Sequence, residues 1–124
     1  MPIAAHRPGH HALRKGRVSL PGHTYLITIV CEHRTPRFSD PRCADVSAAI
    51  LRDSRIWRDA EALSWVLMPD HLHMLLSLGP SEPLPPLLNR IKSVTAQAAN
   101  RAIGRGGPLW MRGYHDRALR REEH

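Results

Sequence analysis

The sequence predicts an α+β fold in which two helices lie on one face of an antiparallel sheet. Strand-like and helix-like segments follow one another along the 124 residues in the order strand, helix, strand, strand, helix, strand. Apolar residues recur at every second position in the strand-like segments and at every third or fourth position in the helix-like ones. This order is typical of the ferredoxin-like arrangement, in which both helices pack on the same side of one sheet.

The first half of the chain is expected to supply an arm, a strand and a helix. Residues 1–22 carry histidine, arginine, glycine and proline without an apolar period, which indicates a basic arm ahead of a domain that spans residues 23–124. Residues 23–32, HTYLITIVCE, have apolar side chains on both faces and therefore predict a central strand. After a proline-containing loop, apolar residues at helical spacing predict one helix over about 43–58.

The second half is expected to supply a hairpin, a long helix and a last strand. Residues 62–68 and 71–78 predict two strands that pair around a tight turn at Pro69 and Asp70. An apolar stripe of period 3.6 then predicts a helix from Leu84 to Gly104. The glycine-bounded segment 106–114 is interpreted as a short strand or extended segment that completes the sheet.

The stretch MPDHLHML places His71 and His73 inside an otherwise apolar strand. Alternation on a strand puts these two imidazoles on one face, roughly 6.5–7 Å apart at Cα, while Leu72 and Met74 face the helices. Two neutral imidazoles on one face can begin a metal site, and an ion held there could polarise a phosphate oxygen. The alternative is a pair of half-exposed histidines bonded to water or to the backbone.

Composition points to a polyanionic partner. Eighteen Lys and Arg residues against 11 Asp and Glu residues give a formal charge of +7 and a pI near 10.7, which favours nucleic acid over a partner-free basic protein. The two cysteines, Cys31 and Cys43, form no CxxC pair. Without a signal peptide or a long apolar run, the chain is expected to be cytoplasmic, with no membrane partner.

Several segments together resemble the REP-associated tyrosine transposases, which belong to the HUH single-tyrosine, IS200-like transposase superfamily. The resemblance begins near residue 23 and continues to the end of the sequence. It rests on four stretches: YLITIVCEHRTPRFSD, WVLMPDHLHMLL, LLNRIKSVTAQAANR and GPLWMRGYHDRALRREEH. Met-Pro-Asp-His-x-His, combined with the lysine-bearing helix and the Trp to Asp-x-x-Leu-Arg segment, is far more specific than His-x-His alone.

The resemblance implies a transposase and single-strand endonuclease mechanism that acts in transposition and DNA recombination. In the family, the histidines that match His71 and His73 hold a divalent ion, manganese or magnesium, and imidazole ligands favour manganese-like ions. A tyrosine on a later helix attacks a single-stranded DNA phosphate and leaves a 5′-phosphotyrosine and a free 3′-hydroxyl. The implied partner is single-stranded or hairpin DNA of repetitive palindromic elements, bound by monomers or dimers.

This sequence departs from the family where the nucleophile should be. The helix that carries the family tyrosine would follow ALRREEH, and the sequence stops there at His124. Its only tyrosines are Tyr25, in the first predicted strand, and Tyr114, at a position that does not match the nucleophile. We therefore expect a C-terminally truncated and inactive transposase domain with no catalytic tyrosine. The alternative is a noncatalytic remnant that still binds single-stranded or hairpin DNA.

Basic and aromatic side chains outside the predicted core are the candidates for DNA contact. Cationic residues off the apolar stripe of the long helix can reach phosphates, and the C-terminal segment combines aromatic rings with arginines, which suits stacking on single-stranded DNA. Solvated charge on the helix and a core role for Trp110 are the alternatives. The hypothesis of an RNA-binding module with the same fold is weakened because such modules stack bases on aromatic side chains, and Phe38 is the only phenylalanine of this sequence. The candidates are Arg90, Lys92, Arg101, Trp110, Arg112, Tyr114, Arg117 and Arg120.

Overall fold

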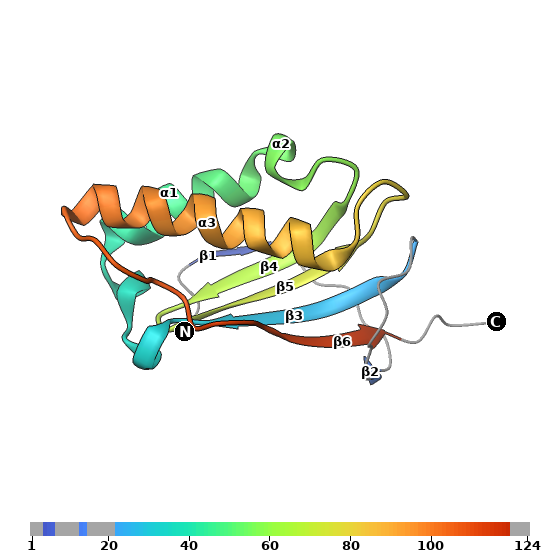
Figure 1. Cartoon of the computed structure of the whole chain (residues 1–124), viewed down its shortest axis with the longest axis horizontal. Coiled ribbons are helices and arrows are strands. Elements are labelled where there is room, and N and C mark those ends of the chain that lie inside the picture. Colours follow the sequence, from blue (N-terminus) through green and yellow to red (C-terminus); the bar gives the residue numbers. More distant parts are fainter. Residues whose placement is uncertain (1–3, 7–12, 15–21, 120–124) are drawn as a thin grey trace.

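The structure is a computed structural model that describes residues 4–6, 13–14 and 22–119. Its centre is an antiparallel sheet whose strands run in the order β1-β4-β5-β3-β6-β2 (Figure 1). The four longer strands alone give the ferredoxin-like order. The strands are Ala4–His6 (β1), Leu13–Arg14 (β2), Thr24–Val30 (β3), Glu61–Met68 (β4), His71–Ser77 (β5) and His115–Leu119 (β6).

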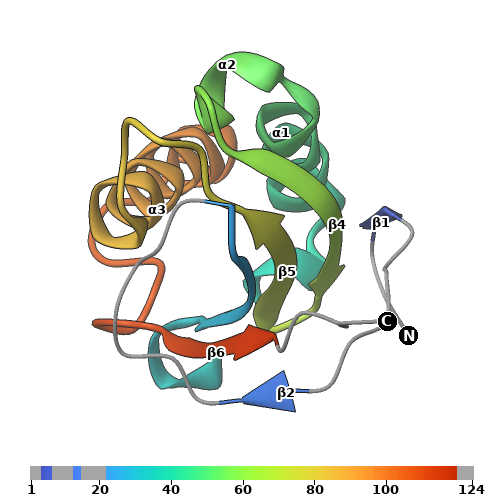
Figure 2. The same cartoon turned by 90° about the vertical axis from the view of Figure 1, so that its right-hand side faces the viewer.

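The helices cover a single face of this sheet. They are α1 (Pro41–Arg52), α2 (Ser54–Trp57) and α3 (Leu84–Ile103), and two short 3-10 turns, η1 (Glu32–Arg34) and η2 (Arg37–Ser39), lie between β3 and α1. Viewed from the end of the molecule, α1, α2 and α3 all lie on the same side of β3, β4 and β5 (Figure 2). The predicted α+β fold with helices on one face is therefore confirmed.

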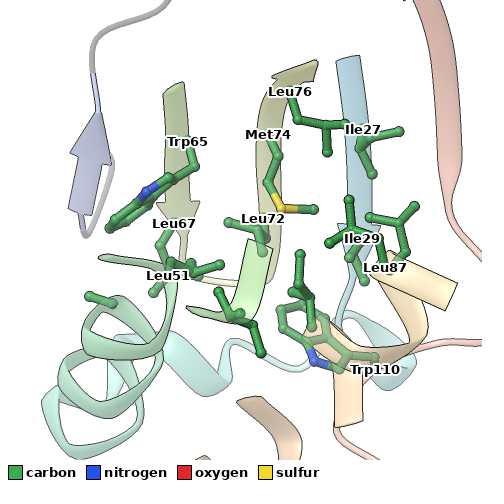
Figure 3. Packing of buried hydrophobic residues seen from close by; sticks show 14 of the residues in the cluster. Ile27, Ile29, Leu51, Trp65, Leu67, Leu72, Met74, Leu76, Leu87 and Trp110 are labelled. Atoms are coloured by element: carbon green, nitrogen blue, oxygen red, sulfur yellow. The ribbon is translucent and has the colours of Figure 1, made fainter. Parts of the chain in front are cut away.

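Alternation along the central strands assigns their two faces. Tyr25, Ile27 and Ile29 of β3 are buried, and their neighbours Leu26 and Thr28 are only partly covered. The same alternation on β5 buries the apolar residues that face the helices, and Figure 3 shows these side chains meeting those of α1 and α3. Each fully buried side chain of this size contributes roughly 1.5–3 kcal/mol relative to exposure. The helix-facing members of β4 and β5 are Trp65, Leu67, Leu72, Met74 and Leu76.

The long helix α3 begins and ends as its sequence predicts. Two prolines, Pro85 and Pro86, occupy its first turn, where a missing N–H costs little. Leu87, Leu88 and Ile91 are fully buried against the sheet. The helix stops at Gly104, whose φ of 65° and ψ of 36° form the left-handed cap that glycine adopts without steric cost.

The predicted helix over 43–58 is two helices. Asp53 interrupts it with an extended backbone, φ −83° and ψ 117°, and its carboxylate accepts a hydrogen bond from the backbone N–H of Arg55. Asp53 therefore ends α1 and caps α2, because an aspartate side chain competes with the helical hydrogen bonds at such a position. The periodicity of the apolar residues continues across this break and hides it in the sequence.

Two other expectations about the sheet are wrong in detail. The last strand is His115–Leu119 and not residues 106–114. In residues 106–114 the extended backbone conformation is interrupted by two glycines with positive φ, Gly107 at 90° and Gly113 at 72°. Within 106–114 the described pairing is a single bridge between Trp110 and Cys31. The arm of residues 1–22 is also not wholly irregular, since its strands β1 and β2 pair with β4 and β6.

Candidate metal and nucleic-acid site

His71 and His73 lie side by side on the sheet face that the helices leave uncovered. In the β5 ladder, His71 is opposite Val30 and Met68, and His73 is opposite Thr28 and Val66. Both histidines are partly exposed, whereas Leu72 between them is fully buried. Their Nε2 atoms are 3.0 Å apart, and the ring planes meet edge to face at 80°.

Each imidazole makes a hydrogen bond through Nδ1, the ring nitrogen that does not face the other histidine. Asp70 Oδ1 lies 2.7 Å from Nδ1 of His71, and the Thr28 hydroxyl lies 2.9 Å from Nδ1 of His73. An ionised Asp70 can only accept, so Nδ1 of His71 donates and Nε2 of a neutral ring keeps its lone pair. When Nδ1 of His73 donates to Thr28 in the same way, the two Nε2 lone pairs converge.

This donor set fits a divalent metal ion. Two metal–nitrogen bonds of about 2.1 Å at a right angle would place their nitrogens about 3.0 Å apart, which matches the separation of the two Nε2 atoms. Metal-binding histidines also commonly donate their other ring N–H to a carboxylate or another oxygen acceptor, as His71 does to Asp70 and as His73 does to Thr28 in the tautomer with its proton on Nδ1. The described residues contain no group of three or more His, Cys, Asp or Glu side chains placed to share one ion. Among the described residues, an ion at this position would therefore have the two imidazoles as its donors of these types.

The titration behaviour of the site follows from these contacts. The hydrogen bond from His71, followed by the positive charge of Arg34, lowers the pKa of Asp70 despite partial burial. Burial, and then the charge of neighbouring His71, lower the pKa of His73. Both effects favour the ionic form of the carboxylate and the neutral form of the His73 imidazole, and the neutral form is the one that binds metal.

Comparison with known proteins assigns the family. A sequence profile described as IS200-like transposase matches residues 19–119. The chain belongs to the IS200-like transposase family. Over 77 residues it is 32% identical to the ISDra2 transposase TnpA of Deinococcus radiodurans, a match that covers 57% of this chain and 55% of that protein. This IS200-like chain thus spans about half the length of that curated relative.

Solved structures share the fold of this IS200-like domain. The crystal structure of a candidate transposase from Deinococcus radiodurans R1 is 27% identical and superposes with a TM-score of 0.66, covering 90% of this chain and 88% of that one. A REP-associated tyrosine transposase bound to a REP hairpin superposes with a TM-score of 0.65 at 21% identity, covering 88% of this chain and 63% of that one. The second likeness concerns the fold alone.

Two of the cations predicted to contact DNA are engaged within the IS200-like fold. Arg90 donates from Nη1 and Nη2 to the Glu82 carboxylate at 2.8 Å and from Nε to the Ile56 carbonyl at 2.9 Å. The Lys92 ammonium donates to two carbonyl oxygens of the loop before β6, those of Met111 and Gly113. Burial lowers the pKa of Lys92. Both cations therefore have hydrogen-bond partners within the fold, which sequence position alone did not reveal.

The other predicted cations differ in position. Arg101, Arg112 and Arg117 are exposed. Arg117 of β6 is paired with Leu26, two residues along β3 from Thr28, so it occupies the same sheet face as the histidine pair. Arg120 lies outside the described residues.

A ring that stacks on DNA bases should be exposed, but both aromatic candidates, Trp110 and Tyr114, are partly or wholly buried. Trp110 is only 6% exposed, packs against Phe38 with ring centroids 5.1 Å apart, and donates its indole N–H to Thr95. Figure 3 shows it among the core side chains, which is the alternative left open for it. Tyr114 is half-buried against the core, and its burial, followed by the charge of Asp116, raises its pKa.

Sequence reasoning missed three residues that the structure brings near the histidine pair. Thr28 was treated only as a strand residue, although its register position opposite His73 follows from pairing of the first and third predicted strands. Arg34 lies in the proline-containing segment that follows the first predicted strand, and its Nε donates to Asp70 Oδ2 at 3.1 Å. His115 is opposite Thr28 on β6 and is exposed; its face could not be assigned while the last strand was placed too early. None of the helices in residues 22–119 has the length and apolar character to cross a membrane.

Proposed function

We propose that this chain forms the metal- and DNA-binding part of an HUH-type single-strand transposase. The observation that carries the proposal is the 3.0 Å convergence of two Nε2 atoms whose Nδ1 atoms are already held by Asp70 and Thr28. Membership of the IS200-like transposase family supports assigning this geometry to phosphodiester chemistry.

In this proposal His71 and His73 hold a divalent ion, with manganese favoured over magnesium by the imidazole ligands. When bound, the ion supplies positive charge that stabilises the charge developing on a phosphate oxygen. Asp70 and Thr28 hold the two imidazole rings in their orientation. The exposed arginines on and beside this face bind the backbone of the strand that approaches it.

The proposed partner is single-stranded or hairpin DNA. The formal charge of +7 supports a polyanion, and a structural neighbour with this fold is bound to a REP hairpin. Palindromic repeats that fold into hairpins are therefore the DNA class that we propose for this chain.

The family reaction joins a tyrosine oxygen to phosphorus and releases a 3′-hydroxyl, and the positions of the tyrosines favour a noncatalytic role for this chain alone. Tyr25 is 1% exposed on the helix-facing side of β3. Tyr114 is half-buried against the core. We therefore propose that neither tyrosine reaches a phosphate at the histidine pair and that these 124 residues bind DNA without supplying the nucleophile.

Manganese titration by calorimetry tests the metal part of this proposal. The unaltered chain should bind Mn²⁺ weakly, because it offers two protein ligands, and the His71→Ala/His73→Ala double variant should give no binding heat. His23→Ala, which removes an exposed histidine immediately before β3, is the matched control and should titrate like the unaltered chain. Identical heats from the double variant and the unaltered chain would remove the metal assignment.

A further inference from the structure

Arg34 is connected to the histidine pair through a single carboxylate. Its Nε lies 3.1 Å from Asp70 Oδ2, and the other oxygen, Asp70 Oδ1, lies 2.7 Å from Nδ1 of His71. Asp70 therefore has the guanidinium on one side and a candidate metal ligand on the other. Arg34 and Asp70 are 36 residues apart in the sequence, so no local sequence motif predicts this contact.

The backbone that presents Arg34 is strained. His33 and Arg34 have φ values of 57° and 53°, and they are consecutive non-glycine residues in the left-handed region. That region is sterically unfavourable for residues with a Cβ atom. A single exposed ion pair returns little stability, so the contact with Asp70 does not by itself account for two such residues.

The strained turn is fixed to the turn that begins the histidine strand. The backbone N–H of Cys31 donates to the Asp70 carbonyl at 2.8 Å, and that of Phe38 donates to the Pro69 carbonyl at 3.0 Å. These two bonds bracket Arg34 on both sides. The guanidinium is thereby held in a set position relative to His71, which is the arrangement expected where strain serves a binding site.

Most of the Arg34 guanidinium remains available. Its side chain is 63% exposed, and only Nε has a hydrogen-bond partner among the described residues. Arg90 provides a contrast within the same chain, because Nε, Nη1 and Nη2 all have partners and the side chain is 18% exposed. The two free Nη groups of Arg34 form the planar fork that binds phosphate oxygens in pairs.

We propose that Arg34 binds a backbone phosphate of single-stranded DNA beside the histidine pair. This inference rests on the proposed function, since it assumes that the strand passes over His71 and His73. Asp70 then has two roles: it orients the imidazole through Oδ1 and aligns the guanidinium through Oδ2. The class of ligand is a phosphodiester with unpaired neighbouring bases, and the contact carries no base preference.

Fluorescence anisotropy with a labelled single-stranded oligonucleotide tests the proposal, in EDTA and again with Mn²⁺. Arg34→Ala should weaken binding about ten-fold in both buffers and reduce the salt slope by about 0.7, the value for one lost single-strand phosphate contact. Arg34→Lys keeps the charge but loses the planar fork of the guanidinium, so its DNA affinity should lie between those of the unaltered chain and Arg34→Ala. Arg55→Ala is the matched control, because it also removes an exposed arginine paired with an aspartate, on the helical side of the molecule.

A fourth variant separates binding from folding. Arg34→Gly should unfold at a higher temperature than Arg34→Ala, because glycine adopts the positive φ without steric cost, yet it should bind DNA as weakly as Arg34→Ala. Equal affinity and salt slope for Arg34→Ala and Arg55→Ala would overturn the proposal. A deficit seen only with Mn²⁺ would overturn it too, because Arg34 would then act through Asp70 and the ion. If the unaltered chain does not bind DNA, both this inference and the proposed function are wrong. If the unaltered chain binds DNA and the Arg34 variants bind it equally well, only this inference is wrong, and the proposed metal site is still tested by the manganese titration.

Discussion

The Thr28 hydroxyl lies 2.9 Å from Nδ1 of His73 across the ladder between β3 and β5. A threonine on the neighbouring strand thus fixes the orientation of one imidazole, as Asp70 fixes the other. The site is therefore a property of the sheet register, because a shift of β3 by one residue would turn Thr28 toward the helices.

We predict that Thr28→Val lowers Mn²⁺ affinity about ten-fold or more. Valine has nearly the same shape but cannot hydrogen-bond Nδ1, and loss of such an outer partner commonly lowers metal affinity by about 10–100-fold. Calorimetric titration measures the effect, and Thr28→Ser, which keeps the hydroxyl, should retain most of the affinity. Equal affinity for the valine and serine variants would show that Thr28 does not orient His73.

A second prediction concerns the salt dependence of DNA binding. Arg117 is exposed on the face of the histidine pair, so Arg117→Ala should reduce the slope of log affinity against log salt by about 0.7. The double variant Arg117→Ala/Arg120→Ala should reduce it further. Anisotropy at several salt concentrations gives the slopes, and Arg42→Ala at the start of α1 is the control. A flat salt response of the unaltered chain would contradict the DNA-binding interpretation itself.

Arg90 is predicted to matter for stability and not for DNA. Its guanidinium pairs with the 10% exposed Glu82 carboxylate through two 2.8 Å bonds, so Arg90→Ala should lower the free energy of unfolding by about 1–3 kcal/mol. Arg101→Ala, at an exposed helix position, should change it far less. Denaturant titration measures both, and a weaker DNA affinity of folded Arg90→Ala would contradict the structural role.

The same pair predicts how stability depends on pH. The hydrogen bond from Arg90 lowers the pKa of Glu82 below its ordinary value of 4.5. The unfolded chain therefore takes up this proton at higher pH than the folded chain, so the contribution of Glu82 is present above about pH 4.5 and is lost as the pH falls through the lowered value. Melting temperatures of the unaltered chain and of Glu82→Gln should differ at pH 7 and converge toward pH 3, and a gap that stays constant would exclude this linkage.

The strand elements and the exposed histidine face follow from periodicity, whereas the use of individual cations does not. Alternation with period two places His71 and His73 on one face of their strand and Leu72 and Met74 on the other face, and the structure agrees. Arg90, in contrast, lies off the apolar stripe of its helix and so resembles a phosphate ligand until Glu82 is placed in three dimensions. Local periodicity reports which way a side chain points and does not report which distant partner it meets.

The failures in the sequence-based fold have local physical causes. Asp53 breaks a helix whose apolar period continues beyond it, because its side chain caps the next helix. Trp110 lies in the glycine-bounded segment 106–114, for which the sequence predicts a short strand or extended segment, and its indole N–H donates to the Thr95 hydroxyl inside the core. A buried polar partner makes such a ring compatible with the interior, and only the tertiary structure supplies that partner.

The last prediction concerns covalent chemistry. An attacking tyrosine has to reach a phosphate at the histidine pair, and positioning of the reacting groups contributes several kcal/mol of a barrier. Tyr25 is buried on the helix-facing side of β3, and Tyr114 is half-buried against the core. We therefore expect this 124-residue chain to bind a labelled hairpin with single-stranded flanks but to form no adduct that survives denaturing electrophoresis, even with Mn²⁺. A stable shifted band that disappears in Tyr114→Phe would identify Tyr114 as a nucleophile, and a band that survives Tyr114→Phe would point to Tyr25 or to another side chain. Either band would contradict a noncatalytic role, because a chain without a nucleophile at the pair cannot retain the DNA once its fold is lost.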